Sequence, residues 1–430
     1  MRLFRGTFLD TPDDPFAGGA LRAEDDGGLL VDDDGTITAR GSFATLASAH
    51  PSAVGVDLRG GLVLPGFVDT HVHYPQLRCI GALGMSLLEW LERCALPEEA
   101  RLADPAYAVE IASAFVGALA NAGTTTALVF GAHYLEATEA LFAAAERVGL
   151  RVTSGLVVGD RGLRDELLTT PARAYDEGLT LAKRWHGAGR LRYAVTPRFS
   201  LSCTAELLAA CAALRNDVPG VVVTSHLNEN AAEIEAVRRL FPGHSSYLDT
   251  YADHGLLGAT TVFAHNVRPT PGELDVLASA GATVSHCPTS NSCLGSGLFP
   301  MRAHLAAGVR VALGSDVGAG TGLSLFKEGL QAYFVQQALG DAGVPLTAAH
   351  LLHLATGAGA DALGLGSTVG SFCDGKAFDA MWLRPQAGSP LDILLTHASS
   401  ADDALAKSFA HATSADVARV WVAGEVVSAR

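Results

Sequence analysis

The chain has 430 residues, of which 49% are hydrophobic and 17% are charged, and its formal net charge is −15. This composition excludes a disordered protein, and the length allows one large barrel domain with an appendage or two to three ordinary domains. The negative charge argues against nucleic acid as a partner and weakly favours a neutral or cationic small substrate.

Targeting and redox signals predict a cytoplasmic protein without a membrane contact. The first residues, Met1–Gly6, are not followed by the long apolar region of a signal peptide. The longest uncharged apolar run, near 111–123, falls short of the roughly 18 residues that a membrane helix needs. The seven cysteines are scattered without a C-x-x-C pair, which suits buried thiols in a reducing compartment. Two of them, Cys287 and Cys293, match no metal-ligand pattern.

The two ends of the chain are predicted to form one small domain. The N-terminal part contains short strand-like runs at 29–31 and 36–38, separated by an Asp-rich turn with Gly35. The C-terminal part contains similar runs at 378–383 and 417–427. We therefore expect residues 1–62 and 369–430 to pair into a small β-sandwich, because chain ends often lie close together.

Between these ends, strands alternate with helices. Eight short apolar stretches are predicted strands: 62–73, 124–130, 152–158, 193–198, 221–226, 261–265, 282–287 and 309–313. Helical stretches rich in Ala, Leu and Glu lie between most of them, at 106–120, 135–148, 205–214, 231–240 and 272–280. This alternation predicts a (β/α)8 barrel over residues 63–368. A doubly wound sheet is less favoured, because no G-x-G-x-x-G follows the first strand.

The first predicted strand ends in a pair of histidines. Side chains two apart on a strand point to the same face, so His71 and His73 project together, with Asp69 behind them. Two adjacent imidazoles can hold one metal ion, although an isolated His-x-His is weak evidence.

Other polar side chains also follow predicted strands: Arg198 the fourth, His226 the fifth, His265 the sixth, His286 the seventh and Asp316 the eighth. The active sites of such barrels lie at these carboxyl ends. His226 and Asp316 are therefore predicted to join His71 and His73 as ligands of one ion, with room for a water molecule.

Neighbouring residues fit hydrolytic chemistry. A metal-bound water ionises near pH ~7, and its attack on a substrate needs a base and an acid. Asp316 is predicted to accept the proton of the water, and Glu229 to donate a proton to a ring nitrogen. His265 is predicted to orient the water or to stabilise an oxyanion, with a buried core histidine as the alternative. The nearest lysine to the end of the fourth strand, Lys183, lies upstream in a helix, so we expect one ion rather than a lysine-bridged pair.

Several motifs resemble the amidohydrolase superfamily and, within it, the guanine deaminases. The resemblance covers nearly the whole chain. The metal motifs are those at 64–73, 225–230 and 314–318, and the narrower match comes from Ser86-Leu87-Leu88-Glu89-Trp90-Leu91 and Thr196-Pro197-Arg198-Phe199-Ser200. The resemblance implies hydrolytic deamination of guanine to xanthine and ammonia, with one divalent metal, Zn²⁺ or Fe²⁺, and a homodimer.

The resemblance also implies the roles of individual residues. His71, His73, His226 and Asp316 would bind the metal. The substrate-binding residues would be Gln76, Arg198, Phe199, His226, Glu229 and Asp316, and Glu229, Asp316 and His265 would be catalytic. Gln76 and Arg198 would hold the edge of the purine, since an Arg suits a carbonyl acceptor and a Gln amide can donate and accept. The glycine-rich run 318–322 departs from the usual pattern and is expected to rim the pocket.

Two other functions are kept as alternatives. A related aminohydrolase would act on another purine, a pterin or a triazine, against which Arg198 and Gln76 argue. A non-enzymatic relative would keep the barrel as a scaffold, but such proteins tend to lose ligands, and all of them are present here.

Overall fold

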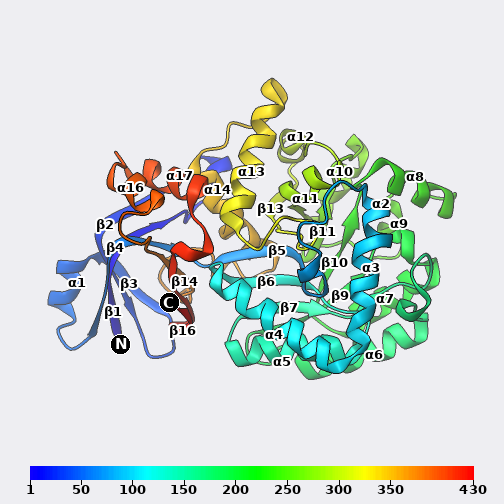
Figure 1. Ribbon diagram of the computed structural model, residues 1–430, viewed down its shortest axis with the longest axis horizontal. Helices are drawn as coiled ribbons and strands as arrows, with labels where there is room; N and C mark the ends of the chain where they lie inside the picture. The colour runs from blue at the N-terminus through cyan, green and yellow to red at the C-terminus, as the bar shows by residue number, and fades with distance from the viewer.

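Both ends of the chain form a single seven-stranded sheet. The structure, a computed structural model, describes residues 1–430, and its two termini lie in the same small domain (Figure 1). The strand order of this sheet is β16-β15-β14-β4-β1-β2-β3. Its strands are β1 (Arg2–Asp10), β2 (Arg22–Val31), β3 (Ile37–Ser42), β4 (Val54–Pro65), β14 (Ala380–Leu383), β15 (Val417–Val422) and β16 (Glu425–Ala429). The predicted pairing of the two ends is confirmed, through the antiparallel ladder of β14 with β4.

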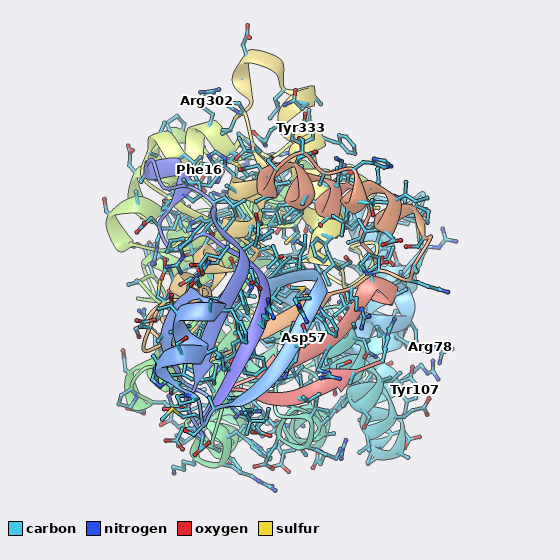
Figure 2. The ribbon with its side chains drawn as sticks, turned by 90° about the vertical axis from the view of Figure 1, so that its left-hand side faces the viewer. Phe16, Asp57, Arg78, Tyr107, Arg302 and Tyr333 are labelled. Carbon is cyan, nitrogen blue, oxygen red and sulfur yellow. The ribbon has the colours of Figure 1, made fainter.

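An aromatic cluster forms the core of the small domain. Alternate residues of β1 point to one face, which places Phe4 and Phe8 in a cluster with Trp421 and side chains of β2, β3, β4 and β14. Phe4 stacks on Phe378 with ring centroids 4.3 Å apart. The strands around this cluster pair in one continuous sheet. Figure 2 turns this domain toward the viewer and shows its N- and C-terminal strands side by side.

The middle of the chain forms a parallel barrel, as predicted. Its strand order is β13-β12-β11-β10-β9-β7-β6-β5, with the short β8 beside β9. The strands are β5 (Phe67–His73), β6 (Thr124–Phe130), β7 (Arg151–Gly155), β8 (Val157–Val158), β9 (Leu191–Pro197), β10 (Val222–Leu227), β11 (Thr261–His265), β12 (Thr283–His286) and β13 (Arg310–Leu313).

Helices surround the barrel (Figure 1). They are α4 (Pro105–Asn121), α5 (Leu135–Val148), α6 (Pro171–Trp185), α7 (Ala205–Asp217), α8 (Ala231–Leu240), α9 (Asp249–Ala252), α10 (Pro271–Ala280), α11 (Pro288–Cys293), α12 (Met301–Ala306), α13 (Leu325–Ala338), α14 (Ala348–Ala355) and α15 (Gly357–Ala362). Local signals set their ends: Asn230 with Glu233 and Thr270 with Glu273 form capping boxes at the starts of α8 and α10. None of the helices alone has the length and apolar character of a membrane span. The segments Leu87–Ala103 and Pro105–Asn121 together reach that length and apolar composition, but they are bent by 117° relative to each other.

The first and last barrel strands meet through the segment that follows β13. The Thr70 hydroxyl donates to the Leu313 carbonyl at 2.8 Å. The Asp316 N–H donates to the His71 carbonyl, and the His73 N–H donates to the Val317 carbonyl, both at 2.8 Å. This closure places Asp316 directly beside the histidine pair.

Some elements differ from the prediction. The N-terminal segment contains a helix, α1 (Phe43–Ala49), and the C-terminal segment contains α16 (Pro390–Thr396) and α17 (Ala401–His411). Phe409 of α17 packs against Phe326 of α13, with ring centroids 5.3 Å apart, so part of the C-terminal segment covers the barrel. The division at residues 62/63 and 368/369 stays a prediction, and β4 runs through the first of these points to Pro65.

Candidate metal centre and substrate pocket

The four predicted metal ligands converge at the carboxyl end of the barrel. His73 Nε2 lies 3.1 Å from His71 Nε2, 3.3 Å from His226 Nε2 and 3.3 Å from Asp316 Oδ1. His71 Nε2 lies 3.2 Å from the same Asp316 oxygen. Donors about 2.0–2.1 Å from one Zn²⁺ in a tetrahedron lie about 3.3–3.4 Å from one another. The spacing of these atoms therefore fits a shared cation.

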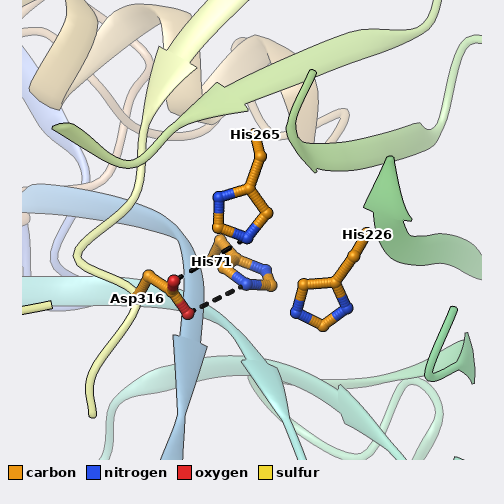
Figure 3. Close-up of side chains that lie close together, drawn as sticks. All are labelled: His71, His226, His265 and Asp316. Atoms are coloured by element: carbon orange, nitrogen blue, oxygen red, sulfur yellow. Dashed lines mark ion pairs between the residues drawn. The ribbon is translucent and has the colours of Figure 1, made fainter. Parts of the chain in front are cut away.

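His265 borders the same group. Ligand atoms of His71, His226, His265 and Asp316 all lie within 4.8 Å of one another, and Figure 3 shows these side chains facing a common centre. His265 Nε2 lies 3.7 Å from Asp316 Oδ2, whereas His71 and His73 Nε2 lie 3.2 and 3.3 Å from Oδ1 of the same carboxylate. These distances agree with the prediction of His73 as a fourth ligand and place His265 beside the group.

Hydrogen bonds set the orientation of two of the rings. His226 Nδ1 lies 2.6 Å from the Arg198 carbonyl oxygen, and His265 Nδ1 lies 3.0 Å from Asn291 Oδ1. A ring nitrogen that donates to an oxygen leaves the other nitrogen with its lone pair. The Nε2 atom of each ring is therefore available to the centre, and that of His265 is buried with no hydrogen-bond partner.

The backbone at the strand ends is shaped to aim these side chains. His265 and Asp316 have φ angles of 73° and 47°, in the left-handed region that non-glycine residues seldom occupy. Asp69 accepts hydrogen bonds from the N–H of Ser315 at 3.0 Å and from its hydroxyl at 2.5 Å. Asp69 therefore connects β5 to the segment that carries Asp316.

Burial determines the protonation states within the group. Burial lowers the pKa of His71 to about 4 and that of His226 well below its usual value, so both rings are neutral. Burial acts to raise the pKa of Asp316, but hydrogen bonds with His71 and His73 outweigh it and hold the pKa well below its usual range. Neutral imidazoles and a carboxylate are the forms that bind metals.

The pKa of Glu229 is raised, in contrast to that of Asp316. Its side chain is buried, and burial together with the charge of Asp316 raises its pKa to about 8. Its Oε1 accepts a hydrogen bond from Ser296 at 3.0 Å, and its Oε2 lies 3.5 Å from His265 Nε2. Glu229 is thus a carboxylic acid near neutral pH and can donate a proton.

A pocket next to the centre contains the predicted substrate-binding residues. Its lining residues are His73, Gln76, Leu87, Trp90, Leu91, Arg198, Phe199, His226, Glu229, His265, Leu294, Asp316 and Ala319. Gln76, Arg198 and Phe199 are thus brought together with Glu229, and Ala319 of the glycine-rich run is also among the lining residues.

An apolar wall completes this pocket. Leu87 and Trp90 lie in α2 (Leu87–Trp90), and Leu91 begins a π-helical turn, η3 (Leu91–Ala95). The sequence motif at residues 86–91 supports the resemblance to the family, but it does not predict that these side chains line the pocket.

Two buried polar residues of the site, Glu99 and His133, are not predicted by the sequence. Glu99, in α3 (Leu96–Ala100), accepts hydrogen bonds from Gln76 Nε2 at 2.6 Å and from Arg198 Nη1 at 2.5 Å. His133 Nε2 lies 3.2 Å from the same carboxylate. Nothing in the sequence distinguishes Glu99 from its neighbour Glu98, because both are acidic residues at the start of one helix.

His286 and the cysteines lie outside the group of possible ligands. His286 stacks on Phe299 with ring centroids 4.3 Å apart, and neither ring nitrogen has a hydrogen-bond partner. All seven cysteines are free, and the Cys287 thiol lies against the carbonyl oxygen of Ser285 at 3.5 Å.

A parallel barrel with a buried His-His-His-Asp group at its carboxyl end is typical of metal-dependent hydrolases. The profile of the amidohydrolase family matches residues 62–427, and the chain belongs to this family. The predicted superfamily is therefore confirmed.

Individual relatives narrow the comparison. The chain is 60% identical to a probable guanine deaminase of Deinococcus radiodurans, over 100% of this chain and 99% of the relative. It superimposes on guanine deaminase of Escherichia coli with a TM-score of 0.96 and 38% identity, covering 100% of both chains. It is also similar to a Clostridium acetobutylicum guanine deaminase with guanine bound in the active site, with a TM-score of 0.91, 27% identity and 99% coverage of both chains.

Proposed function

We propose that this protein is a guanine deaminase, which hydrolyses guanine to xanthine and ammonia. The observation that carries the proposal is the convergence of the four predicted metal ligands with Glu229, Arg198 and Gln76 at one pocket. The 60% identity to a probable guanine deaminase over the full chain supports the same substrate.

The proposed metal ligands are His71, His73, His226 and Asp316, and they would hold one divalent cation. Zn²⁺ is the first choice because three imidazoles and one carboxylate are a common zinc donor set, and Fe²⁺ accepts the same donors. When bound, such a cation lowers the pKa of water and so supplies hydroxide near neutral pH.

The side chains around the pocket would divide the remaining work. Asp316, held ionised by His71 and His73, accepts the proton of the attacking water. Glu229 gives its proton to the ring nitrogen next to C2, where the water attacks. The proton held by Asp316 would then pass to the amino group, the bond between C2 and this nitrogen would break, and ammonia would leave. The added hydroxyl would return its proton to Glu229 as it becomes the C2 carbonyl of xanthine. His265 lies beside both carboxyl groups, at 3.5 Å from Glu229 and 3.7 Å from Asp316, and would stabilise the developing charge.

The purine would be held by its edge and its face. Arg198 and Gln76 are buried hydrogen-bonding groups in a pocket that also has an apolar wall. A buried donor that finds no acceptor is costly, so such a site rejects analogues that lack the matching group. Phe199 would pack near the ring.

The proposal includes a cytoplasmic location and a homodimer. The seven free cysteines suit a reducing compartment, and the dimer rests on the resemblance to the family. Purine breakdown is the process that such an activity would serve.

Ammonia release from a panel of bases tests the proposed function. Purified, metal-replete protein is expected to release one ammonia per guanine and to form xanthine, with adenine, cytosine and 8-oxoguanine measured alongside. Turnover of another base in preference to guanine would contradict the proposal.

A further inference from the structure

A buried carboxylate lies behind the two side chains that face the substrate. Glu99 is 3% exposed, in a helix outside the barrel strands. Its Oε1 accepts from Gln76, and its Oε2 accepts from Arg198 and adjoins His133. Gln76 lies in the turn that follows β5 and Arg198 directly follows β9, so Glu99 is the group that joins them.

We propose that Glu99 is a positioning residue that fixes Gln76 and Arg198 as hydrogen-bond donors toward the carbonyl-bearing edge of a 6-oxopurine. This inference deepens the proposed function and rests on it. It assigns to Glu99 no contact with the substrate.

The contacts of Gln76 allow only one orientation of its amide. An ionised carboxylate can only accept hydrogen bonds, so the group that faces Glu99 is the NH₂. On the other side, Gln76 Oε1 lies 3.2 Å from the N–H of Gly318, which can only donate. The side-chain oxygen of Gln76 therefore accepts from the N–H of Gly318, and the second N–H of the amide remains for a ligand.

Gly318 allows this close approach. A Cβ atom at this position would lie 2.2 Å from the main-chain carbonyl oxygen of Gln76 and 2.8 Å from Cβ of Cys79. Only a residue without a side chain can therefore bring its N–H to the amide here.

Arg198 is fixed by the same carboxylate. Its Nη1 donates to Glu99, and it also lies 3.3 Å from His133 Nε2. A guanidinium has five N–H donors and no acceptor, so Arg198 can meet a ligand only as a donor. The backbone carbonyl of Arg198 also holds His226 at 2.6 Å, which couples the position of this residue to the metal centre.

Glu99 itself remains ionised in this buried position. Burial acts to raise its pKa, but the charge of Arg198 and the hydrogen bond with His133 outweigh this effect and lower the pKa below its usual value. Arg198 and Gln76 then both present donors, which fits acceptors such as O6 and N7 and disfavours an exocyclic amino group at C6.

Glu99→Gln tests this role in the metal-replete protein. The substituted amide can accept through only one of its two atoms, so one of its partners loses its acceptor. We expect the KM for guanine to rise about 10- to 100-fold, with kcat changed by less than about 3-fold and the metal content unchanged. Glu92→Gln, at an exposed position of the same segment, is the matched control and is expected to behave like the wild type.

Two further variants separate positioning from structural support. Glu99→Asp keeps the charge but withdraws the carboxylate by one methylene, and it should also raise the KM for guanine. This variant provides the test if Glu99→Gln does not fold. In an Arg198→Met background, Glu99→Gln should add less to KM than it does alone, because its partner is already absent.

The outcomes are distinct. A wild-type protein that does not deaminate guanine would refute the proposed function and this inference together. Wild-type turnover with unchanged KM values in both Glu99 variants would refute the positioning role alone. A loss of kcat in proportion to lost metal, or full additivity with Arg198→Met, would show a structural role instead and would also overturn it.

Discussion

Glu229→Gln is the substitution that tests the proposed chemistry most specifically. The amide has nearly the same shape as the carboxylic acid and can still accept from the Ser296 hydroxyl, which lies 3.0 Å from Glu229 Oε1. It cannot supply a proton. Any loss of turnover in a folded, metal-replete variant therefore reports on proton transfer.

The structure sets the size of the expected effect. With a pKa raised to about 8 by burial and by the Asp316 charge, Glu229 is protonated in about 90% of molecules at pH 7. An exposed glutamate of pKa 4.5 would be protonated in well under about 1%. General acid catalysis contributes about 10²- to 10⁴-fold, which corresponds to about 3 to 5 kcal/mol of activation free energy. We expect kcat to fall by that factor, with KM within a few-fold of the wild type.

The assay is steady-state conversion of guanine to xanthine, followed by absorbance, with metal content measured on the same samples. Glu235→Gln on the exposed side of α8 removes a surface ion pair with Arg238 and serves as the control; such pairs contribute little to stability. Normal turnover by Glu229→Gln, or an equal loss in Glu235→Gln, would show that Glu229 is not the proton donor.

Three further predictions follow from single contacts. Asp316→Ala should lower the metal-to-chain ratio after dialysis, measured by mass spectrometry, and retention of a full equivalent would remove Asp316 from the ligand set. Gly318→Ala should raise the KM for guanine at least several-fold, because the added Cβ would lie 2.2 Å from the main-chain carbonyl oxygen of Gln76. An unchanged KM would show that the segment around Gly318 can move away. Burial lowers the pKa of His286 from 6.5 to about 3, so its contribution to stability is intact above pH 6.5 and is lost as the pH falls toward 3. Urea unfolding should therefore show wild type losing about 2–3 kcal/mol more than His286→Phe between pH 7.5 and 4.5, and parallel losses would contradict this.

The barrel was predictable because its strands and helices carry local signals. Buried parallel strands are continuous apolar runs, and α5 and α8 have the predicted bounds because Gly149 ends the first and the Asn230–Glu233 capping box begins the second. The pairing of the chain ends was also predictable. Helices α16 and α17 were not, because strands flank them on both sides and the packing of α17 against α13 depends on distant parts of the chain.

The site residues that follow strands were predictable. Those whose position depends on contacts with distant residues were not. His71, His73, His226 and Asp316 each stand at a strand end, and the structure brings them together. His286 also ends a strand, but it turns to stack on Phe299. Glu99 gave no signal, because its partner Arg198 is 99 positions away and acidic residues at a helix start are usually solvated.

A metal titration of the stripped protein tests the central claim most directly. After chelation, Zn²⁺ would be added back in substoichiometric steps while the conversion of guanine to xanthine is followed. The structure predicts no turnover without metal, a linear rise, and a plateau at one equivalent per chain. Turnover in the stripped protein, a plateau at two equivalents, or no turnover of guanine at any metal level would contradict it.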